Sequence, residues 1–141
     1  MDGSMKRHMH VACAIIEQSG NVLAAQRSKI MTLPLKWEFP GGKIEPGETA
    51  ADCLARELHE ELGIAVIIDR ALPFFTHDYP DFTVTLYPFI CKLSEGTITP
   101  HEHSAIAWVE PLRMMELDWA AADLPLIREY QAQITRGACL T

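Results

Sequence analysis

The 141-residue sequence lacks several features that define other classes of protein. No apolar run approaches the roughly 18 residues that a membrane-spanning helix needs, and the first ten residues contain no apolar core of a signal peptide. The four cysteines (Cys13, Cys53, Cys91 and Cys139) form no Cys-x-x-Cys pair, so neither a zinc site nor a disulfide framework is indicated. We therefore expect a cytoplasmic protein with reduced thiols and no membrane partner.

An excess of basic residues is also missing. The chain has 12 Lys and Arg against 19 Asp and Glu, which gives a formal net charge of −7. A long nucleic acid requires a basic stripe for its phosphates, so we do not expect such a partner. A small anionic substrate remains compatible, because a bound metal and a few local cations can set the field at one site.

The length is sufficient for one hydrophobic core. We predict a single domain at residues 10–141, as a monomer or homodimer, preceded by a tail at residues 1–9. In that tail Gly3-Ser4-Met5 has the composition of a tag remnant.

Apolar and β-branched runs alternate with turn residues along the chain. They predict strands at 10–17, 22–27, 37–39, 65–76, 82–93 and 105–109. Helices are expected from Glu48 or Thr49 to Gly63, at 111–117 and at 124–136. Strands interleaved with helices indicate the α/β class, with a three-layer α/β/α sandwich around a mixed sheet.

The segment from Gly41 to Ile64 (GGKIEPGETAADCLARELHEELGI) joins a glycine-rich turn to an acidic helix. At 100° per residue, Glu60 and Glu61 lie within about 60° of Glu57 on the helix surface. A separate apolar stripe for packing is formed by Leu54, Leu58 and Leu62.

Three carboxylates on one helix face have two interpretations. One is a solvated acidic surface. The other is a binding site for a hard divalent cation, which would remove the repulsion between like charges at i and i+4, a cost of about 0.2–0.5 kcal/mol. Mg²⁺ prefers oxygen ligands and is usually completed by substrate phosphates. Arg56, four residues before Glu60, is expected to hold the Glu60 carboxylate by a bidentate pair.

This segment resembles the Nudix box, GX5EX7REUXEEXGU, in which U is apolar. Every specified position is filled: Gly42, Glu48, Arg56, Glu57, Leu58, Glu60, Glu61, Gly63 and Ile64. The preceding stretch, Trp37-Glu38-Phe39-Pro40-Gly41-Gly42-Lys43, resembles MutT-type nucleoside triphosphate pyrophosphohydrolases. His101-Glu102-His103, Trp108 and residues 122–126 resemble the CTP pyrophosphohydrolase branch. The resemblance implies the Nudix fold.

The resemblance also implies a metal centre with Mg²⁺, for which Mn²⁺ is a substitute. Its ligands would be Glu57, Glu60 and Glu61, with Glu102 and the Gly42 carbonyl as additional candidates. The catalytic set would be these glutamates together with Arg56. Glu60 is the preferred general base and Glu102 the alternative, although Glu102 also fits an ordinary loop acid. We expect His101 and His103 to be exposed to solvent rather than to bind the metal.

Residues outside the box correspond to substrate contacts in similar enzymes. Arg27 and Lys43 would contact phosphates, Phe39 would stack on a base, and Asp123 would read the base edge. Tyr79 and Phe82 would line the pocket. Each has a structural alternative: ion pairing for Arg27 and Lys43, core packing for the aromatic residues, and an N-cap of the last helix for Asp123.

The activity implied by the resemblance is Mg²⁺-dependent hydrolysis of nucleoside and deoxynucleoside triphosphates to a nucleoside monophosphate and pyrophosphate. Cytidine nucleotides and damaged nucleotides are the expected substrates, which would sanitise the nucleotide pool. MutT members specific for oxidised guanine carry Asn where this chain has Asp123, so 8-oxo-dGTP is the alternative. A dinucleotide or nucleotide-sugar hydrolase and a non-catalytic nucleotide sensor are further alternatives.

Overall fold

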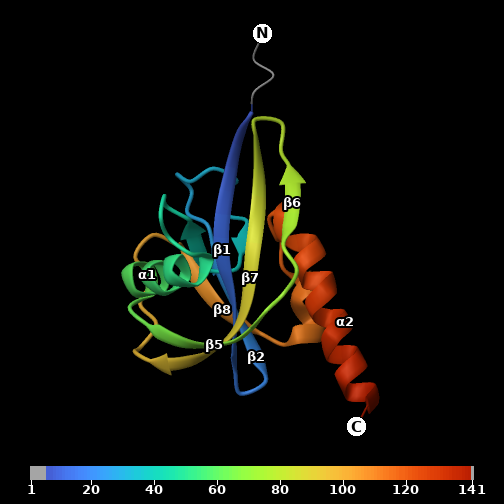
Figure 1. Cartoon of the computed structure of the whole chain (residues 1–141). Coiled ribbons are helices and arrows are strands. Elements are labelled where there is room, and N and C mark those ends of the chain that lie inside the picture. Colours follow the sequence, from blue (N-terminus) through green and yellow to red (C-terminus); the bar gives the residue numbers. More distant parts are fainter. Residues whose placement is uncertain (1–5, 141) are drawn as a thin grey trace.

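The computed structural model describes residues 6–140 and shows helices on both sides of a mixed β-sheet (Figure 1). The strands in this part of the chain are β1 (Arg7–Gln18), β2 (Asn21–Gln26), β3 (Trp37–Glu38), β4 (Gly41–Lys43), β5 (Ala65–Ala71), β6 (Phe75–Asp78), β7 (Phe82–Glu95) and β8 (Ala105–Val109). The helices are α1 (Ala50–Leu62), the 3₁₀ helices η1 (Pro111–Glu116) and η2 (Ala121–Asp123), and α2 (Leu124–Leu140).

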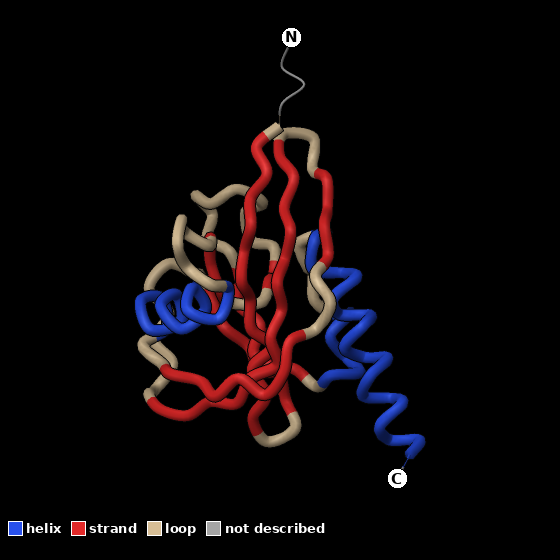
Figure 2. Tube along the Cα trace, viewed as in Figure 1, coloured by secondary structure: helices blue, strands red, loops and turns tan. Residues whose placement is uncertain are grey.

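The sheet is organised around the parallel pair β1 and β7, which run side by side along the molecule (Figure 2). The main path of the sheet is β3-β2-β1-β7-β5. β4, β6 and β8 pair with β1, β7 and β2, and all of these pairs are antiparallel. The pairing of β4 with β1 places the glycine turn against the centre of the sheet, directly before α1 begins.

Both faces of the sheet are covered, as the alternation in β1 shows. Cys13 and Ile15 pack into one core with residues of α2, whereas Ala14 and Ile16 pack into another with residues of α1. The predicted apolar stripe of α1 is fully buried in that second core: Leu54, Leu58 and Leu62. The α/β class and the mixed sheet between helices are therefore confirmed.

Several predicted boundaries differ from the structure. The strand expected at 65–76 is divided into β5 and β6, because Pro73 lies between them and has no N–H for the ladder. β1 begins at Arg7, inside the stretch predicted as a tail, and α2 continues beyond residue 136. The suggested tag remnant at residues 3–5 lies outside the described residues.

None of the described helices is both long enough and apolar enough to span a membrane. Cys13, Cys53 and Cys91 are buried free thiols.

Candidate active site

The acidic helix α1 has well-defined ends. The Thr49 side chain accepts a hydrogen bond from the Asp52 backbone N–H at 3.0 Å, which caps the first turn. Gly63 ends the helix in the left-handed conformation, with φ of 71°, where an L-residue would be strained. These caps confirm the predicted helix and fix which carboxylates share its outer face.

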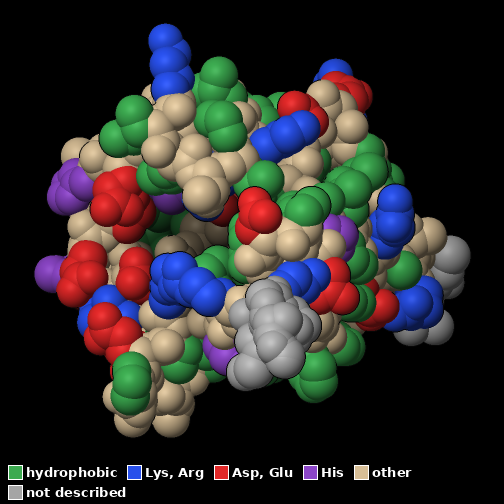
Figure 3. Space-filling model, turned by 90° about the horizontal axis from the view of Figure 1, so that it is seen from above, with side chains coloured by type: hydrophobic (Ala, Val, Ile, Leu, Met, Phe, Trp, Pro, Cys, Tyr) green, Lys and Arg blue, Asp and Glu red, His purple; other side chains and the backbone are tan. Residues whose placement is uncertain are grey.

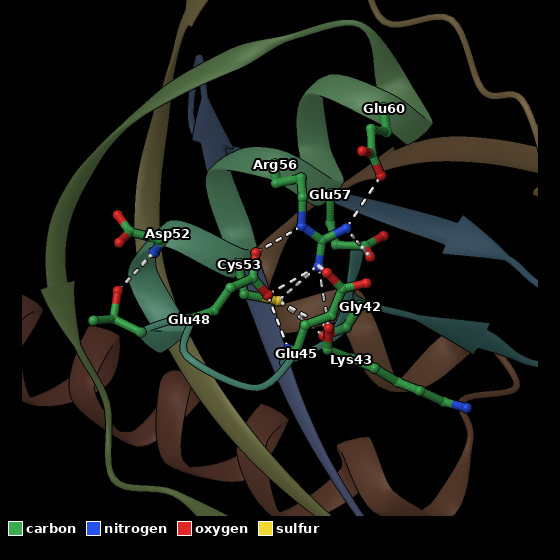
Figure 4. A network of polar contacts seen from close by, with 10 residues as sticks. Gly42, Lys43, Glu45, Glu48, Asp52, Cys53, Arg56, Glu57 and Glu60 are labelled. Carbon is green, nitrogen blue, oxygen red and sulfur yellow. Dashed lines mark hydrogen bonds and ion pairs between the residues drawn. The ribbon is translucent and has the colours of Figure 1, made fainter.

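Arg56, midway along α1, is the centre of a polar network (Figure 4). Its guanidinium makes a bidentate pair with Glu48, from Nε to Oε2 at 2.7 Å and from Nη2 to Oε1 at 3.0 Å. Single contacts reach Glu57 at 3.0 Å and Glu60 at 3.2 Å. The prediction of a bidentate pair between Arg56 and Glu60 is therefore wrong, because Glu48 lies in the fork geometry that a guanidinium favours.

The carboxylates around Arg56 differ in how easily they ionise. The hydrogen bonds from Arg56 lower the pKa of Glu48 to about 2. Burial raises the pKa of Glu57, against the opposing effect of Arg56, and the charges of Glu60 and Glu102 add to the increase. Glu57 therefore lies in a local excess of negative charge that one guanidinium does not remove.

The glycine turn lies directly against Glu57. A Cβ at Gly42 would lie 2.1 Å from Glu57 Cδ, so the backbone approaches this carboxyl as closely as glycine allows. Behind the turn, the Cys53 thiol donates to the carbonyls of Gly42 and Lys43, at 3.4 Å and 3.3 Å. The glycine turn is thus held between β1 and α1, and the Glu57 side chain lies against Gly42 of this turn.

Glu61 has different surroundings from Glu57 and Glu60. Its side chain is 6% exposed, against 60% for Glu60. It accepts hydrogen bonds from the backbone N–H of His101 at 2.6 Å and of Glu102 at 2.9 Å. Glu61 therefore anchors the loop that carries Glu102, and the Glu102 charge contributes to the raised pKa of Glu57 across the site.

The residues around Glu57 have the chemistry of a hard-cation site. Carboxylates on α1, Glu102 on the facing loop and the backbone of the Gly42 turn supply oxygen donors. Within the described residues, no three His, Cys, Asp or Glu side chains converge in ligand geometry. Arg56 contacts Oε2 of Glu57 and Oε1 of Glu60, so the other oxygen of each carboxylate is left for a cation.

A cavity of about 460 Å³ opens beside the glycine turn. From above, the surface is hollowed at this end, and acidic side chains gather beside the hollow on the side of α1 (Figure 3). The predicted residues that line it are Arg27, Phe39, Gly42, Lys43, Tyr79, Phe82 and Asp123. The cavity also has an apolar wall on β1 and β7, formed by Met9, Val11, Val84 and Leu86. The sequence did not predict this wall, because alternating apolar residues in a strand can line a pocket or pack in a core.

The cationic side chains expected to contact phosphates have different partners. Arg27 donates to Glu38 at 2.8 Å and to the Thr32 carbonyl at 2.6 Å, so it already organises the 28–36 loop. Lys43 extends away from the Arg56 network (Figure 4) and is exposed at the rim of the cavity. Lys43 is therefore available for an anion, whereas Arg27 would have to give up bonds.

The aromatic residues of the cavity belong to the core as well. Phe39 is 3% exposed and packs on Trp119, with ring centroids 4.9 Å apart. The Tyr79 hydroxyl accepts a hydrogen bond from the Ala122 backbone N–H at 2.9 Å, and its ring packs on Phe82. Phe39 and Tyr79 therefore pack in the core, as the structural alternative predicted, and also line the cavity.

Asp123 lies in the cavity wall immediately before α2 and is 5% exposed. Burial raises the pKa of Asp123 well above its usual value, and the nearby Glu38 adds to the shift, while a hydrogen bond from the Phe39 backbone opposes it. The raised pKa extends the pH range over which Asp123 is a neutral carboxyl, a form that both donates and accepts a hydrogen bond.

The prediction that His103 is exposed is wrong. Its side chain is 6% exposed and lies between Glu38, with Nε2 2.7 Å from Oε2, and Glu61, with Nδ1 3.4 Å from Oε1. Only its position just before the apolar strand β8 could have indicated burial. His101, two residues earlier, is exposed as predicted.

A second cavity, of about 530 Å³, lies at the turn between β1 and β2 and contains none of the predicted site residues.

The sequence matches the NUDIX domain family over residues 6–130. The chain belongs to the NUDIX family. The predicted family and its hydrolase activity are therefore confirmed.

Similar proteins agree in fold and length. The chain is 35% identical to the CTP pyrophosphohydrolase of Escherichia coli over 124 residues, which cover 88% of this chain and 92% of that protein. It is 42% identical to the 8-oxo-dGTP diphosphatase of Proteus vulgaris over 100 residues, or 70% and 89% of the two chains. The solution structure of the E. coli ORF135 protein superposes with a TM-score of 0.77 at 33% identity, over 90% of this chain and 91% of that one.

Proposed function

We propose that this Nudix hydrolase converts nucleoside and deoxynucleoside triphosphates to nucleoside monophosphates and pyrophosphate, with Mg²⁺ as cofactor. Cytidine nucleotides, including damaged forms, are the proposed substrates, and the proposed role is sanitation of the cytoplasmic nucleotide pool. The observation that supports this most is the adjoining position of two features. A cavity with a buried carboxyl in its wall opens beside a helix whose carboxylates outnumber their cation.

The α1 carboxylates supply the reactive end of this proposed site. Glu57 and Glu60 would hold Mg²⁺, or Mn²⁺ in its place, with Glu61, Glu102 and the Gly42 carbonyl as further candidate ligands. When bound, the metal would neutralise the triphosphate and activate a water for attack on phosphorus. Arg56 would remain anchored to Glu48 through its bidentate pair, and its single contacts with Glu57 and Glu60 leave the other oxygen of each carboxylate for the metal.

Among these carboxylates, Glu60 is the proposed general base. Its side chain is exposed, so it can take a proton from the attacking water and pass it to solvent. Glu102 is the alternative, because its charge acts on Glu57 from the opposite side of the site.

The cavity would receive the nucleoside. A neutral Asp123 carboxyl can donate to N3 of cytosine and accept from its exocyclic amine, which matches both groups on that base edge. The relative named CTP pyrophosphohydrolase supports this choice.

A second candidate substrate is 8-oxo-dGTP. A neutral carboxyl can also donate to O6 and accept from the N7–H that oxidation creates, so Asp123 would offer the same pair of bonds as an Asn. The relative named 8-oxo-dGTP diphosphatase supports this candidate.

The deciding experiment measures pyrophosphate release with Mg²⁺ and ranks substrates by kcat/KM. The panel contains CTP, dCTP, 5-methyl-dCTP, 8-oxo-dGTP, dGTP, ATP, ADP-ribose and a diadenosine polyphosphate. We expect the cytidine nucleotides to rank first. If 8-oxo-dGTP ranked first by a wide margin, it would replace the cytidine nucleotides as the proposed substrate. Activity on ADP-ribose or the diadenosine compound alone would refute triphosphate hydrolysis. Inactivity on the whole panel would favour a nucleotide sensor.

A further inference from the structure

The buried imidazole of His103 joins two parts of the candidate site that are distant in sequence. On one side its Nε2 lies 2.7 Å from Glu38 Oε2 at the end of β3. On the other, its Nδ1 lies 3.4 Å from Glu61 Oε1 on α1. Among the described residues, this Nδ1 is the buried side-chain polar atom without a hydrogen-bond partner. A buried polar atom in this state is uncommon and calls for an explanation.

Each neighbour of His103 continues into a functional element. Glu38 accepts a hydrogen bond from Arg27 at 2.8 Å, and Arg27 also holds the Thr32 carbonyl, so this branch reaches the wall of the nucleotide cavity. Glu61 accepts from the backbone N–H of His101 and of Glu102, so the other branch reaches the loop beside Glu57. The contacts therefore run continuously from the cavity to the loop that carries Glu102.

The chemistry of the linking side chain suits this position. An imidazole is planar and rigid, and its two nitrogens point in different directions, so one ring can contact two separate carboxylates. Glu38 and Glu61 are 21% and 6% exposed at their side chains, so water screens their mutual repulsion poorly. The ring between them separates the two charges and sets their spacing.

We infer that His103 is a positioning residue that couples the Arg27–Glu38 side of the nucleotide cavity to the Glu61–Glu102 loop. A displacement of Glu38 moves His103, which moves Glu61 and the two backbone N–H groups bound to it. Contact of a nucleotide with the cavity would thereby shift the loop of Glu102. This consequence for catalysis rests on the proposed function, whereas the physical coupling does not.

The test is a double-mutant cycle read by amide hydrogen exchange at His101 and Glu102, with NMR detection and without metal or nucleotide. His103→Gln should speed exchange at these two amides by about tenfold, the loss expected when a hydrogen bond to a charged group is weakened. Glu38→Ala should speed it in the wild-type background and have no further effect beside His103→Gln. His101→Gln is the matched control, because the same replacement on the same loop removes an exposed ring.

Two results would overturn the inference. One is unchanged exchange in His103→Gln, and the other is a Glu38→Ala effect of equal size with and without His103. If His103→Gln does not fold, His103→Asn replaces it in the cycle. In either case the single variant Glu38→Ala must speed exchange at the amides of His101 and Glu102.

A kinetic measurement tests the catalytic consequence separately. His103→Gln should lower kcat while KM for the best triphosphate changes less than about twofold, since the ring lies outside the cavity wall. If the protein hydrolysed no triphosphate, the proposed function would fail, and the exchange result would still decide the coupling.

Discussion

Two groups of carboxylates around α1 are treated differently by the fold. The outer acidic cluster (Glu48, Glu57 and Glu60) surrounds the Arg56 guanidinium at the surface. The inner acidic cluster (Glu38, Glu61 and Asp123) contacts backbone N–H groups, His103 and Arg27, and two of its members, Glu61 and Asp123, are buried. In the outer cluster three negative charges share one cation, so an excess of charge is left for a metal.

The inner cluster leaves no comparable excess. Arg27 pairs with Glu38, two backbone N–H groups satisfy Glu61, and burial raises the pKa of Asp123, which extends the pH range of its neutral form. Glu60 and Glu61 are adjacent in sequence, yet one is exposed and the other is a buried anchor. Neighbouring residues of one motif therefore have separable effects on turnover and on stability.

The largest expected effect is on turnover in the outer cluster. Glu60→Gln should lower kcat for pyrophosphate release by about 10²–10⁴-fold, the range for loss of a general base. The free energy of unfolding should change by less than about 0.5 kcal/mol, because the side chain is exposed. Glu95→Gln, on an exposed residue at the end of β7, is the control. Activity within tenfold of wild type in Glu60→Gln would refute the assignment of the base.

The next prediction concerns Asp123, whose pKa burial raises above the usual 3.8. A raised pKa in the folded state stabilises the protein below the usual value, and this contribution is lost as the pH rises through the folded-state pKa. Asp123→Asn, which cannot ionise, should therefore equal wild type near pH 3.5 and become more stable toward neutral pH. The gain should be at least about 1 kcal/mol, because a tenfold difference in proton affinity between the folded and unfolded states corresponds to about 1.4 kcal/mol.

Denaturant unfolding at a series of pH values measures this difference. Asp118→Asn, on an exposed aspartate, should show no such trend. A constant difference between Asp123→Asn and wild type across the series would show that the Asp123 carboxyl is not the titrating group.

Much of the outer cluster could be predicted from the sequence, because it lies on one helix. The spacing of Glu57, Glu60 and Glu61, the leucine stripe and Gly63 follow from helical periodicity and capping. The bidentate partner of Arg56 could not be predicted in this way. Glu48 lies before the helix, and its position depends on the turn closed by the Glu45 N–H.

The inner cluster depends on contacts between residues far apart in the chain. Glu38 and His103 are separated by 65 positions, and Glu61 and Glu102 by 41. Periodicity carries no information on such pairs, so His103 was predicted to be exposed. The apolar cavity wall on β1 and β7 could not be predicted for the same reason, because it is formed by a parallel pairing of residues more than 70 positions apart.

The smallest predicted effect separates Glu61 from Glu60 directly. Glu61→Gln keeps one oxygen for the N–H groups of His101 and Glu102, but these bonds lose the assistance of a charge. We expect the free energy of unfolding to fall by about 1 kcal/mol, the difference between hydrogen bonds to charged and to neutral acceptors. Denaturant unfolding of the metal-free protein measures it, with Glu60→Gln as the matched replacement one residue away. Equal stability of the two variants would mean that Glu61 does not anchor the loop in solution, and the division into outer and inner clusters would lose its physical basis.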